Sequence, residues 1–266
     1  MQHFLFTAHS VKVVGGSFKL GDKVDLEVDA LRRARIARNH TATHILHWAL
    51  REVLGDHVNQ AGSFVAPERL RFDFTHFEAM TNEQIIEVEK LANDQIMRAF
   101  DVETYNTSLK EAREKGVTAL FGEKYGEEVR VVNVGNFSEE LCGGCHVKNT
   151  GEIGFVKIIT ETSVGANARR IEACTSYDAY NYTSELIAEM DKAASLLRGP
   201  KNQLSQNVSK MLGNVKELKK ELEFAHSKES TMIRKEAFDD LSKSSMGFDY
   251  LIADCGDIRN YDIKEY

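Results

Sequence analysis

The chain has 266 residues, of which 42% are hydrophobic and 28% are charged. This length allows one large or two ordinary domains with a real core, and the composition excludes both a disulfide-stapled miniprotein and wholesale disorder. The 34 basic and 41 acidic side chains give a net charge of −7, which taken alone argues against a nucleic-acid partner. There is no apolar run of about 18 residues and no secretory signal pattern, so we expect no membrane partner and a cytoplasmic location.

Strands and helices interleave up to residue 175 without the regular spacing of a βαβ fold. Residues 17–28 alternate apolar and polar side chains around a central Gly-Asp pair, which predicts a β-hairpin. A helix is predicted over 29–54, and a second begins after the capping box of Thr81 and Gln84. Strands are predicted at 128–134, 154–162 and 169–174. This order favours an α+β fold over a doubly wound sheet.

Two helical patterns follow, separated by the helix stop at Gly199 and Pro200. Apolar or small side chains recur at spacings of three and four: Ala179, Thr183, Leu186, Met190, Ala193 and Leu197, then Met211, Val215, Leu218, Leu222 and Ala225. Each arm is too short for a long parallel coiled coil, so we expect an antiparallel hairpin over 176–245, with two surface helices packed on other elements as the alternative. A strand-like run begins at Phe248, so we expect residues 246–266 to start a truncated C-terminal domain.

A histidine pair is the sharpest local signal. His40 and His44 are four residues apart on the predicted helix, so both imidazoles can face one metal ion. The pair alone is weak evidence, because histidines at this spacing also occur by chance. Position 41 is not glutamate, so the metalloprotease pattern is absent, and His47 is interpreted as a supporting or core histidine.

A cysteine-containing loop is the second signal. Residues 140–147 read Glu-Leu-Cys-Gly-Gly-Cys-His-Val, which adds a thiolate and an imidazole to the helical pair and completes a four-ligand set suited to zinc. The same Cys-x-x-Cys-His pattern is the attachment motif of c-type haem, but that chemistry belongs to exported proteins. A thioredoxin-like redox motif is also disfavoured, because the flanking βαβ pattern is missing.

Several segments together resemble the editing domain of the alanyl-tRNA synthetase family. They follow one another in that family's order, between about residues 19 and 175. The segments are 32–47 (RRARIARNHTATHILH), 53–63, 70–74, 138–144, 163–164 and 169–173. Such a set of motifs is highly specific.

This resemblance implies a proofreading site that hydrolyses the ester of serine or glycine wrongly attached to the tRNA for alanine. An alanine pocket cannot exclude the smaller glycine by size, and serine differs by a single hydroxyl group, so binding discrimination falls short. The family's zinc ligands fall on His40, His44, Cys142 and His146. Its glutamine near the pocket falls on Gln60, with Ser63 close by, and these two are the candidate catalytic residues. The family usually has threonine at the position of Cys145, which creates a rival thiolate, and residues 165–168 also depart from its pattern.

The resemblance also divides the chain into four expected parts. These are a partial β-barrel over 1–30, the editing domain over 31–175, the helical hairpin over 176–245 and the start of a C-terminal domain over 246–266. The family's aminoacylation domain, where ATP and alanine bind, has no counterpart in the sequence, so no aminoacylation is expected. Oligomerisation is expected to depend on the missing part of the C-terminal domain.

The partner implied by the resemblance is the acceptor end of tRNA(Ala) carrying a wrong amino acid. The candidate contacts are Arg32, Arg33, Arg35, Arg38, Arg169 and Arg170. Two other interpretations fit the same residues: a free-standing trans-editing hydrolase, and a zinc-stabilised tRNA-binding module without activity. The role of zinc also stays open, because four protein ligands fill a tetrahedral shell and suit a structural as well as a catalytic ion.

Overall fold

The fold is seen in a computed structural model that describes residues 9–119, 125–239, 242–243 and 249–250. It divides into two compact units, Met1–Tyr182 and Thr183–Tyr266. The mixture of helices with antiparallel sheets confirms the α+β class.

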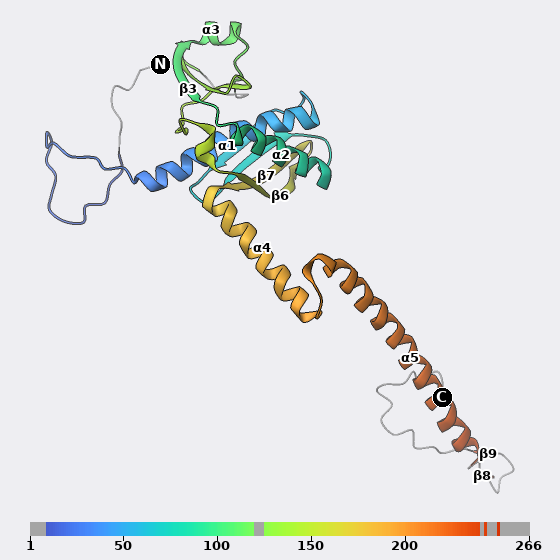
Figure 1. The fold of residues 1–266 in the computed structure, drawn as a ribbon. Coiled ribbons are helices and arrows are strands. Elements are labelled where there is room, and N and C mark those ends of the chain that lie inside the picture. The colour runs from blue at the N-terminus through green and yellow to red at the C-terminus, as the bar shows by residue number, and fades with distance from the viewer. Residues whose placement is uncertain (1–8, 120–124, 240–241, 244–248, 251–266) are drawn as a thin grey trace. The chain divides into compact units, whose positions relative to one another are not determined.

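The first unit is built around an antiparallel four-stranded sheet with the strand order β1-β2-β7-β6. Its strands are β1 (Gln60–Val65), β2 (Leu70–Thr75), β6 (Val156–Gly165) and β7 (Ala168–Thr175). Helices α1 (Ala30–Leu54) and α2 (Asn82–Met97) pack on each other and on this sheet (Figure 1). The arrangement gives two layers, with the core between the helices and the sheet.

The core forms because β2 alternates strictly. Phe72 and Phe74 are fully buried, while the intervening side chains are partly exposed. Ile45 and Leu46 of α1 are also fully buried in the same apolar cluster, and Trp48 packs against it. The middle of α1 is thereby held rigidly against the sheet.

A second, three-stranded antiparallel sheet carries the cysteine loop. Its strands are β3 (Val102–Ser108), β4 (Glu128–Val134) and β5 (Ser138–Leu141), in that order, and helix α3 (Leu109–Glu114) packs on β3 and β4. The loop begins directly after β5 and leads to the short 3₁₀ helix η1 (Thr150–Ile153). Contacts of α1 with β5 and η1 bring both ends of this loop to the histidine helix.

The helix predictions for this unit are confirmed by their caps. The side chain of Asp29 accepts a hydrogen bond from the Arg32 N–H at the start of α1. The helix ends at Gly55, whose φ of 110° strains any other residue. The capping box of Thr81 and Gln84 is present at the start of α2.

The three predicted strands are β4, β6 and β7, whereas β1, β2, β3, α3 and β5 were not predicted.

The predicted N-terminal hairpin is wrong. The turn at its centre does form, with the Asp22 N–H donating to the Lys19 carbonyl at 3.1 Å and φ of +93° at Gly21. However, the described residues 9–29 contain no strand, and side chains such as Leu26 are exposed. A two-stranded hairpin is marginal in water without further strands or a packed face, and no described residue supplies either. The described part of 1–30 therefore shows no barrel strand, and residues 1–8 lie outside it.

The predicted C-terminal helices are present. They are α4 (Ser176–Leu196) and α5 (Leu204–Asp239), with the 3₁₀ helix η2 (Lys201–Gln203) between them. The apolar stripes expected to pack in the hairpin are 43–62% exposed at Leu186, Met190, Met211, Val215, Leu218 and Leu222. Antiparallel packing of these stripes is thus absent from the described residues, and the hairpin stays a prediction.

The last predicted strand is confirmed only in part. A two-stranded sheet pairs β8 (Ser242–Lys243) with β9 (Asp249–Tyr250), and the other residues from 244 onward lie outside the described residues. Within the part of the chain that the structure describes, no helix combines the length and apolar character needed to cross a membrane.

Replacing Phe72 with alanine should lower the free energy of unfolding of the first unit by about 3–5 kcal/mol, because the truncation leaves a cavity between α1 and the sheet. The fluorescence of Trp48, the single tryptophan, reports this transition in urea. Phe77→Ala is the matched control, because that side chain is 73% exposed. Equal midpoints for the two variants would contradict the assigned core.

Candidate metal centre

Four potential metal ligands meet where the cysteine loop crosses α1. His40 and His44 lie one turn apart on the helix, and the loop brings Cys142 and His146 to them. One ligand atom from each side chain lies within 4.8 Å of all the others. The structure therefore brings together the four side chains that were predicted as metal ligands from the sequence.

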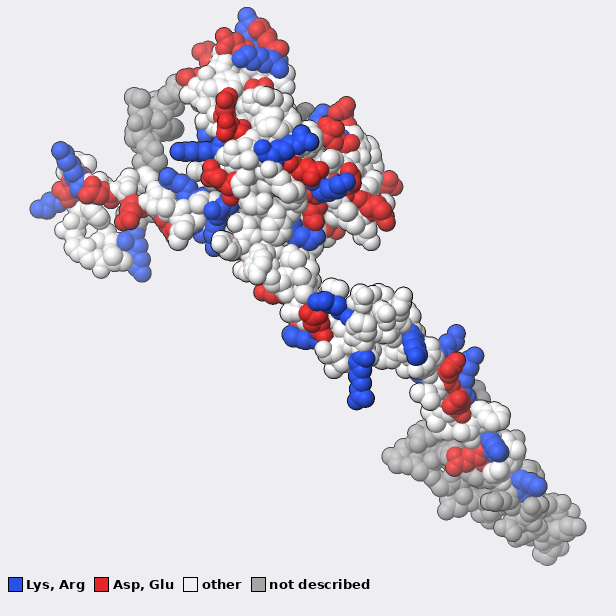
Figure 2. All heavy atoms as spheres, in the orientation of Figure 1, with Lys and Arg blue, Asp and Glu red and all other residues white. Residues whose placement is uncertain are grey.

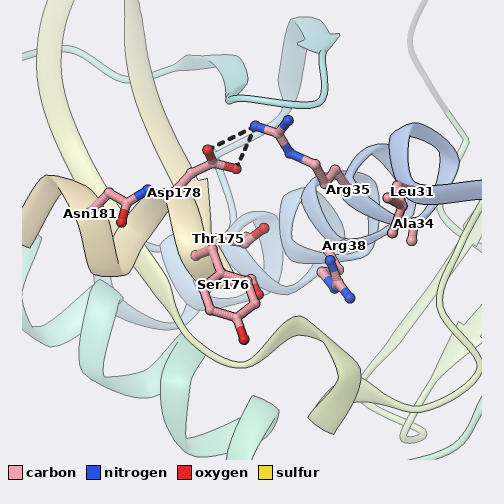
Figure 3. A pocket seen from close by; sticks show the side chains of 9 residues that line it. Leu31, Ala34, Arg35, Arg38, Thr175, Ser176, Asp178 and Asn181 are labelled. Carbon is pink, nitrogen blue, oxygen red and sulfur yellow. Dashed lines mark hydrogen bonds and ion pairs between the residues drawn. The ribbon is translucent and has the colours of Figure 1, made fainter.

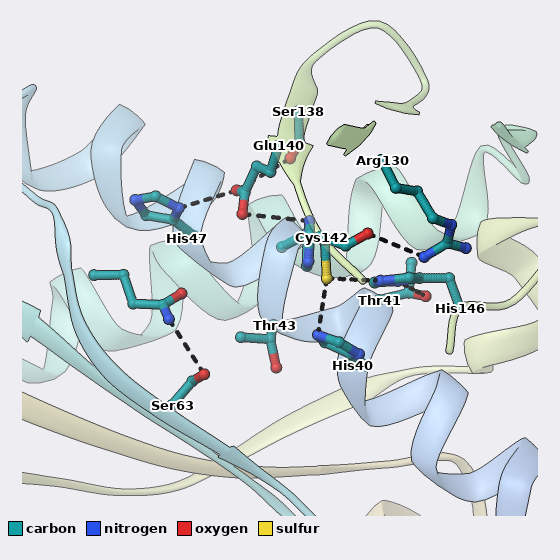
Figure 4. A network of polar contacts seen from close by, with 12 residues as sticks. His40, Thr41, Thr43, His47, Ser63, Arg130, Ser138, Glu140, Cys142 and His146 are labelled. Atoms are coloured by element: carbon teal, nitrogen blue, oxygen red, sulfur yellow. Dashed lines mark hydrogen bonds and ion pairs between the residues drawn. The ribbon is translucent and has the colours of Figure 1, made fainter. Parts of the chain in front are cut away.

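The thiol stands between two imidazoles. Cys142 Sγ lies 3.4 Å from His40 Nε2 and 3.3 Å from His146 Nε2 (Figure 4). The ring of His44 completes the group, with its centroid 4.8 Å from that of His146. Cys145 is exposed and does not belong to the group, so the geometry selects Cys142 over its rival.

The loop is held in place by an arginine and a glycine. Nη1 of Arg130, on β4, donates to the carbonyl oxygens of Cys142 at 3.0 Å and Gly144 at 2.8 Å. A Cβ atom on Gly144 would lie 2.0 Å from Cε1 of His40, which is an overlap. The backbone can approach the imidazole this closely only because residue 144 has no side chain.

Thr41 orients His146. The Thr41 hydroxyl donates to the Ala37 carbonyl at 3.0 Å, so towards its other neighbours its oxygen acts as an acceptor. It accepts from the Val147 N–H at 3.2 Å, and His146 Nδ1 lies 3.1 Å away. His146 therefore carries its proton on Nδ1, which leaves the Nε2 lone pair directed to the thiol side.

A buried carboxylate supports the helix side of the centre. Glu140 Oε1 accepts a hydrogen bond from Nδ1 of His47 at 3.0 Å (Figure 4). Its other oxygen lies 3.4 Å from Nδ1 of His44, outside hydrogen-bond geometry. Ser138 Oγ is 3.4 Å from Oε1. His47 thus belongs to the supporting network and not to the ligand group, as the sequence indicated.

The electrostatics keep the imidazoles neutral. Burial, followed by the neighbouring His44, lowers the pKa of His40 to about 4 and that of His146 to about 2. Burial likewise lowers the pKa of His44. Burial alone would raise the pKa of Glu140, but His44 and the hydrogen bonds from His47 and Ser138 outweigh it, so this pKa lies below its ordinary value. Burial thus favours the unprotonated form of the ligand histidines, and a proton on His44 favours the ionised form of Glu140.

These donors fit a metal ion of borderline softness. Three neutral imidazoles and one thiol are the nitrogen and sulfur ligands typical of tetrahedral zinc sites. A carboxylate near the outer nitrogen of a ligand histidine is the usual support in such sites. The group can therefore hold a metal ion, and its chemistry suits zinc.

Gln60 and Ser63 lie together on β1. In a regular strand, residues three apart point to opposite faces, but the pairing of β1 with β2 is irregular between Gln60 and Gly62. The irregularity lets Gln60 Nε2 donate to Ser63 Oγ at 3.2 Å. Figure 4 shows Ser63 apart from the metal-ligand group, with Thr43 between Ser63 and His40 in that view.

Two of the arginines on α1 are engaged within the first unit. Arg35 makes two hydrogen bonds to the carboxylate of Asp178, at 2.8 and 3.0 Å (Figure 3). Arg38 donates through Nε to the backbone carbonyl of Glu152 at 2.9 Å, which leaves its charge uncompensated by that contact. Arg32 and Arg33 are exposed.

The two adjacent arginines of β7 form ion pairs with carboxylates on neighbouring strands of the sheet. Arg169 is bound by both carboxylate oxygens of Glu161, and Arg170 by both oxygens of Asp73, at 2.7 and 2.8 Å. A phosphate would have to compete with these carboxylates. Figure 2 shows basic and acidic side chains interspersed over the visible face of the first unit, in keeping with the acidic net charge.

The sequence analysis did not predict three supporting residues of the centre: Thr41, Arg130 and Glu140, whose carboxylate lies beside both His44 and His47. Thr41 and Glu140 lie inside the two motifs, so their position there was the available signal. Arg130 lies twelve residues before the thiol, and no local pattern connects it to the loop.

Comparison with known families agrees with this geometry. Residues 129–172 match the family described as the threonyl and alanyl tRNA synthetase second additional domain. The match runs from β4 through the cysteine loop into β7, and so covers the loop half of the centre. The segment that carries the cysteine loop is thus similar to a domain named after two aminoacyl-tRNA synthetases.

The curated relatives make this similarity more specific. Alanine–tRNA ligase of Carboxydothermus hydrogenoformans is 52% identical over 218 residues, which is 82% of this chain and 25% of that protein. The alanine–tRNA ligases of Petrotoga mobilis and Alkaliphilus oremlandii are 49% and 48% identical over 81% and 80% of the chain, and 24% of each protein. The chain is therefore related to the alanine–tRNA ligases and spans about a quarter of their length, which confirms the resemblance seen in the sequence.

Gly144→Ala should weaken metal binding about tenfold or more, because the new methyl group displaces the His40 ring. Competition for Zn²⁺ with a coloured chelator measures this effect. Gly143→Ala is the matched control, because its Cβ meets nothing within 4 Å. If both variants bind Zn²⁺ like the unaltered chain, the close approach of loop and helix is wrong.

Glu140→Gln should also lower Zn²⁺ affinity, by about 10–100-fold, because the amide removes the negative charge that lies 3.4 Å from Nδ1 of the ligand His44. Glu139→Gln is the control on the same strand, since Glu139 accepts a hydrogen bond from Tyr105 and has no contact with the histidines. An unchanged affinity in Glu140→Gln would show that the carboxylate does not support the ligands.

Proposed function

We propose that this chain edits mischarged tRNA by hydrolysing the ester bond that joins serine or glycine to tRNA(Ala). Water adds to the ester carbonyl, and the products are the free amino acid and tRNA with its ribose hydroxyl restored. The proposal depends chiefly on one observation, the cluster of three neutral imidazoles and one thiol whose loop half lies in a segment similar to a synthetase domain. Its relation to alanine–tRNA ligases suggests which tRNA is the substrate.

In this proposal Zn²⁺ is held by His40, His44, Cys142 and His146. When bound, the ion would supply Lewis acidity, either by lowering the pKa of a water molecule or by binding the substrate's amino group or hydroxyl. Thr41 keeps the proton of His146 on Nδ1, which leaves Nε2 free to bind the ion, and the Glu140 carboxylate lies beside His44.

Gln60 and Ser63 are proposed to bind the amino acid. Their amide and hydroxyl groups form a polar pair on β1 that is accessible to solvent. Serine differs from alanine by one hydroxyl group. A site whose polar groups hydrogen-bond that hydroxyl binds serine in strong preference to alanine. Exchange of the Gln60–Ser63 hydrogen bond for bonds to the substrate would orient the ester without a change of charge.

The wider assignments follow from the same relation. We propose the acceptor end of tRNA(Ala) as partner, the cytoplasm as location, and the editing domain over 31–175 followed by the hairpin over 176–245. Attachment of alanine with ATP is assigned to parts of the relatives outside the aligned quarter.

Deacylation of seryl-tRNA(Ala) tests the proposal. The purified chain should release serine faster than buffer, and a strong chelator or Cys142→Ala should lower the rate about 100-fold or more. Cys145→Ala is the matched control and should keep both activity and bound zinc, because this thiol lies outside the ligand group.

The outcomes separate the alternatives. No acceleration over buffer would contradict the editing function and favour a tRNA-binding module without activity. Activity in Cys142→Ala equal to that of the unaltered chain would contradict the ligand assignment.

A further inference from the structure

A basic pocket adjoins the metal centre. It has a volume of about 640 Å³, and Gly144, Cys145 and His146 of the cysteine loop form part of its wall. The other polar residues that line it are Arg33, Arg38, Arg130, Lys148 and Glu152. Four cations against one carboxylate make this pocket positive on a chain whose net charge is −7.

The cations of the pocket are not neutralised by ion pairs among the described residues. Arg38 and Arg130 donate to backbone carbonyls, which carry no net charge. The one carboxylate, Glu152, accepts from the backbone N–H of Lys148 at 3.2 Å through Oε1. By contrast, carboxylates neutralise the charge of Arg35 and of the β7 arginines.

We propose that this pocket binds a backbone phosphodiester at the acceptor end of the RNA, with Arg33, Arg38, Arg130 and Lys148 as its contacts. The inference rests on the proposed editing function and names the phosphate site that belongs to it. An ester on the terminal ribose is within one nucleotide of the nearest phosphodiester, and His146 belongs to both the pocket and the ligand group. The pocket also has the volume of a small-ligand site, and guanidinium groups match phosphate oxygens in pairs.

Arg130 links the two sites physically. Its Nη1 holds the loop carbonyls, and its side chain also lines the pocket. A phosphate bound there contacts the same guanidinium group that positions Cys142. Because an Arg130 variant would also loosen the metal loop, the test uses the two cations that hold no loop residue through their side chains, Arg33 and Lys148.

The test compares Arg33→Gln/Lys148→Gln with Lys110→Gln/Arg113→Gln, which removes the same charge from residues that line a different hollow on α3. Binding of uncharged tRNA(Ala) is measured across salt concentrations, and hydrolysis of seryl-tRNA(Ala) alongside it. The pocket variant should lower the salt slope by about 0.7 for each lost contact and raise KM with kcat and zinc content unchanged. Glu152→Gln removes the one carboxylate of the pocket and should therefore raise the affinity for uncharged tRNA(Ala).

Two results would overturn the inference. One is a pocket variant with the same salt slope and KM as the control variant. The other is competition by inorganic phosphate as strong as that by tRNA, which would assign the pocket to free anions. Because the salt slope is measured without hydrolysis, an inactive but RNA-binding chain would contradict the editing proposal and leave the phosphate site supported.

Discussion

The close approach of the cysteine loop to helix α1 is the constraint on which the site depends. Gly144 lies against the His40 ring at a distance that no side chain would allow, and Arg130 holds the loop there through two carbonyl oxygens. Both partners are rigid: α1 is anchored by the core beneath it, and the loop continues directly from β5. These two elements together place the four ligand atoms within 4.8 Å of one another.

Burial shifts the pKa values of the histidines and of Glu140 in opposite directions, and the contacts around Glu140 offset the shift there. It disfavours the charged forms of the histidines, which keeps their nitrogens available as donors. The same burial disfavours the ionised form of Glu140, yet contacts with His44, His47 and Ser138 preserve its charge. A carboxylate beside a ligand histidine is a common support of metal sites in proteins.

Local signals predicted the parts of the fold that depend on local physics. The Asp29 cap and Gly55 placed α1, and the Thr81–Gln84 box placed the start of α2. The hairpin over 17–28 failed because its pattern is satisfied only when other strands cover it. The C-terminal helices were predictable from their period, since helices form through neighbouring backbone groups, but that period does not determine what covers their apolar stripes. In the candidate site, motif spacing and the family resemblance together predicted the four ligands. The Gln60–Ser63 contact depends on a strand irregularity, and the Arg130 contact depends on long-range folding.

The ligands come from distant parts of the chain: His40 and Cys142 are 102 residues apart in sequence. An ion would find these ligands together only in the folded chain, so its binding would stabilise the folded first unit. Folding of the first unit and occupancy of the centre would then be linked equilibria, and a higher concentration of free metal would make the contact between the two sheets more stable.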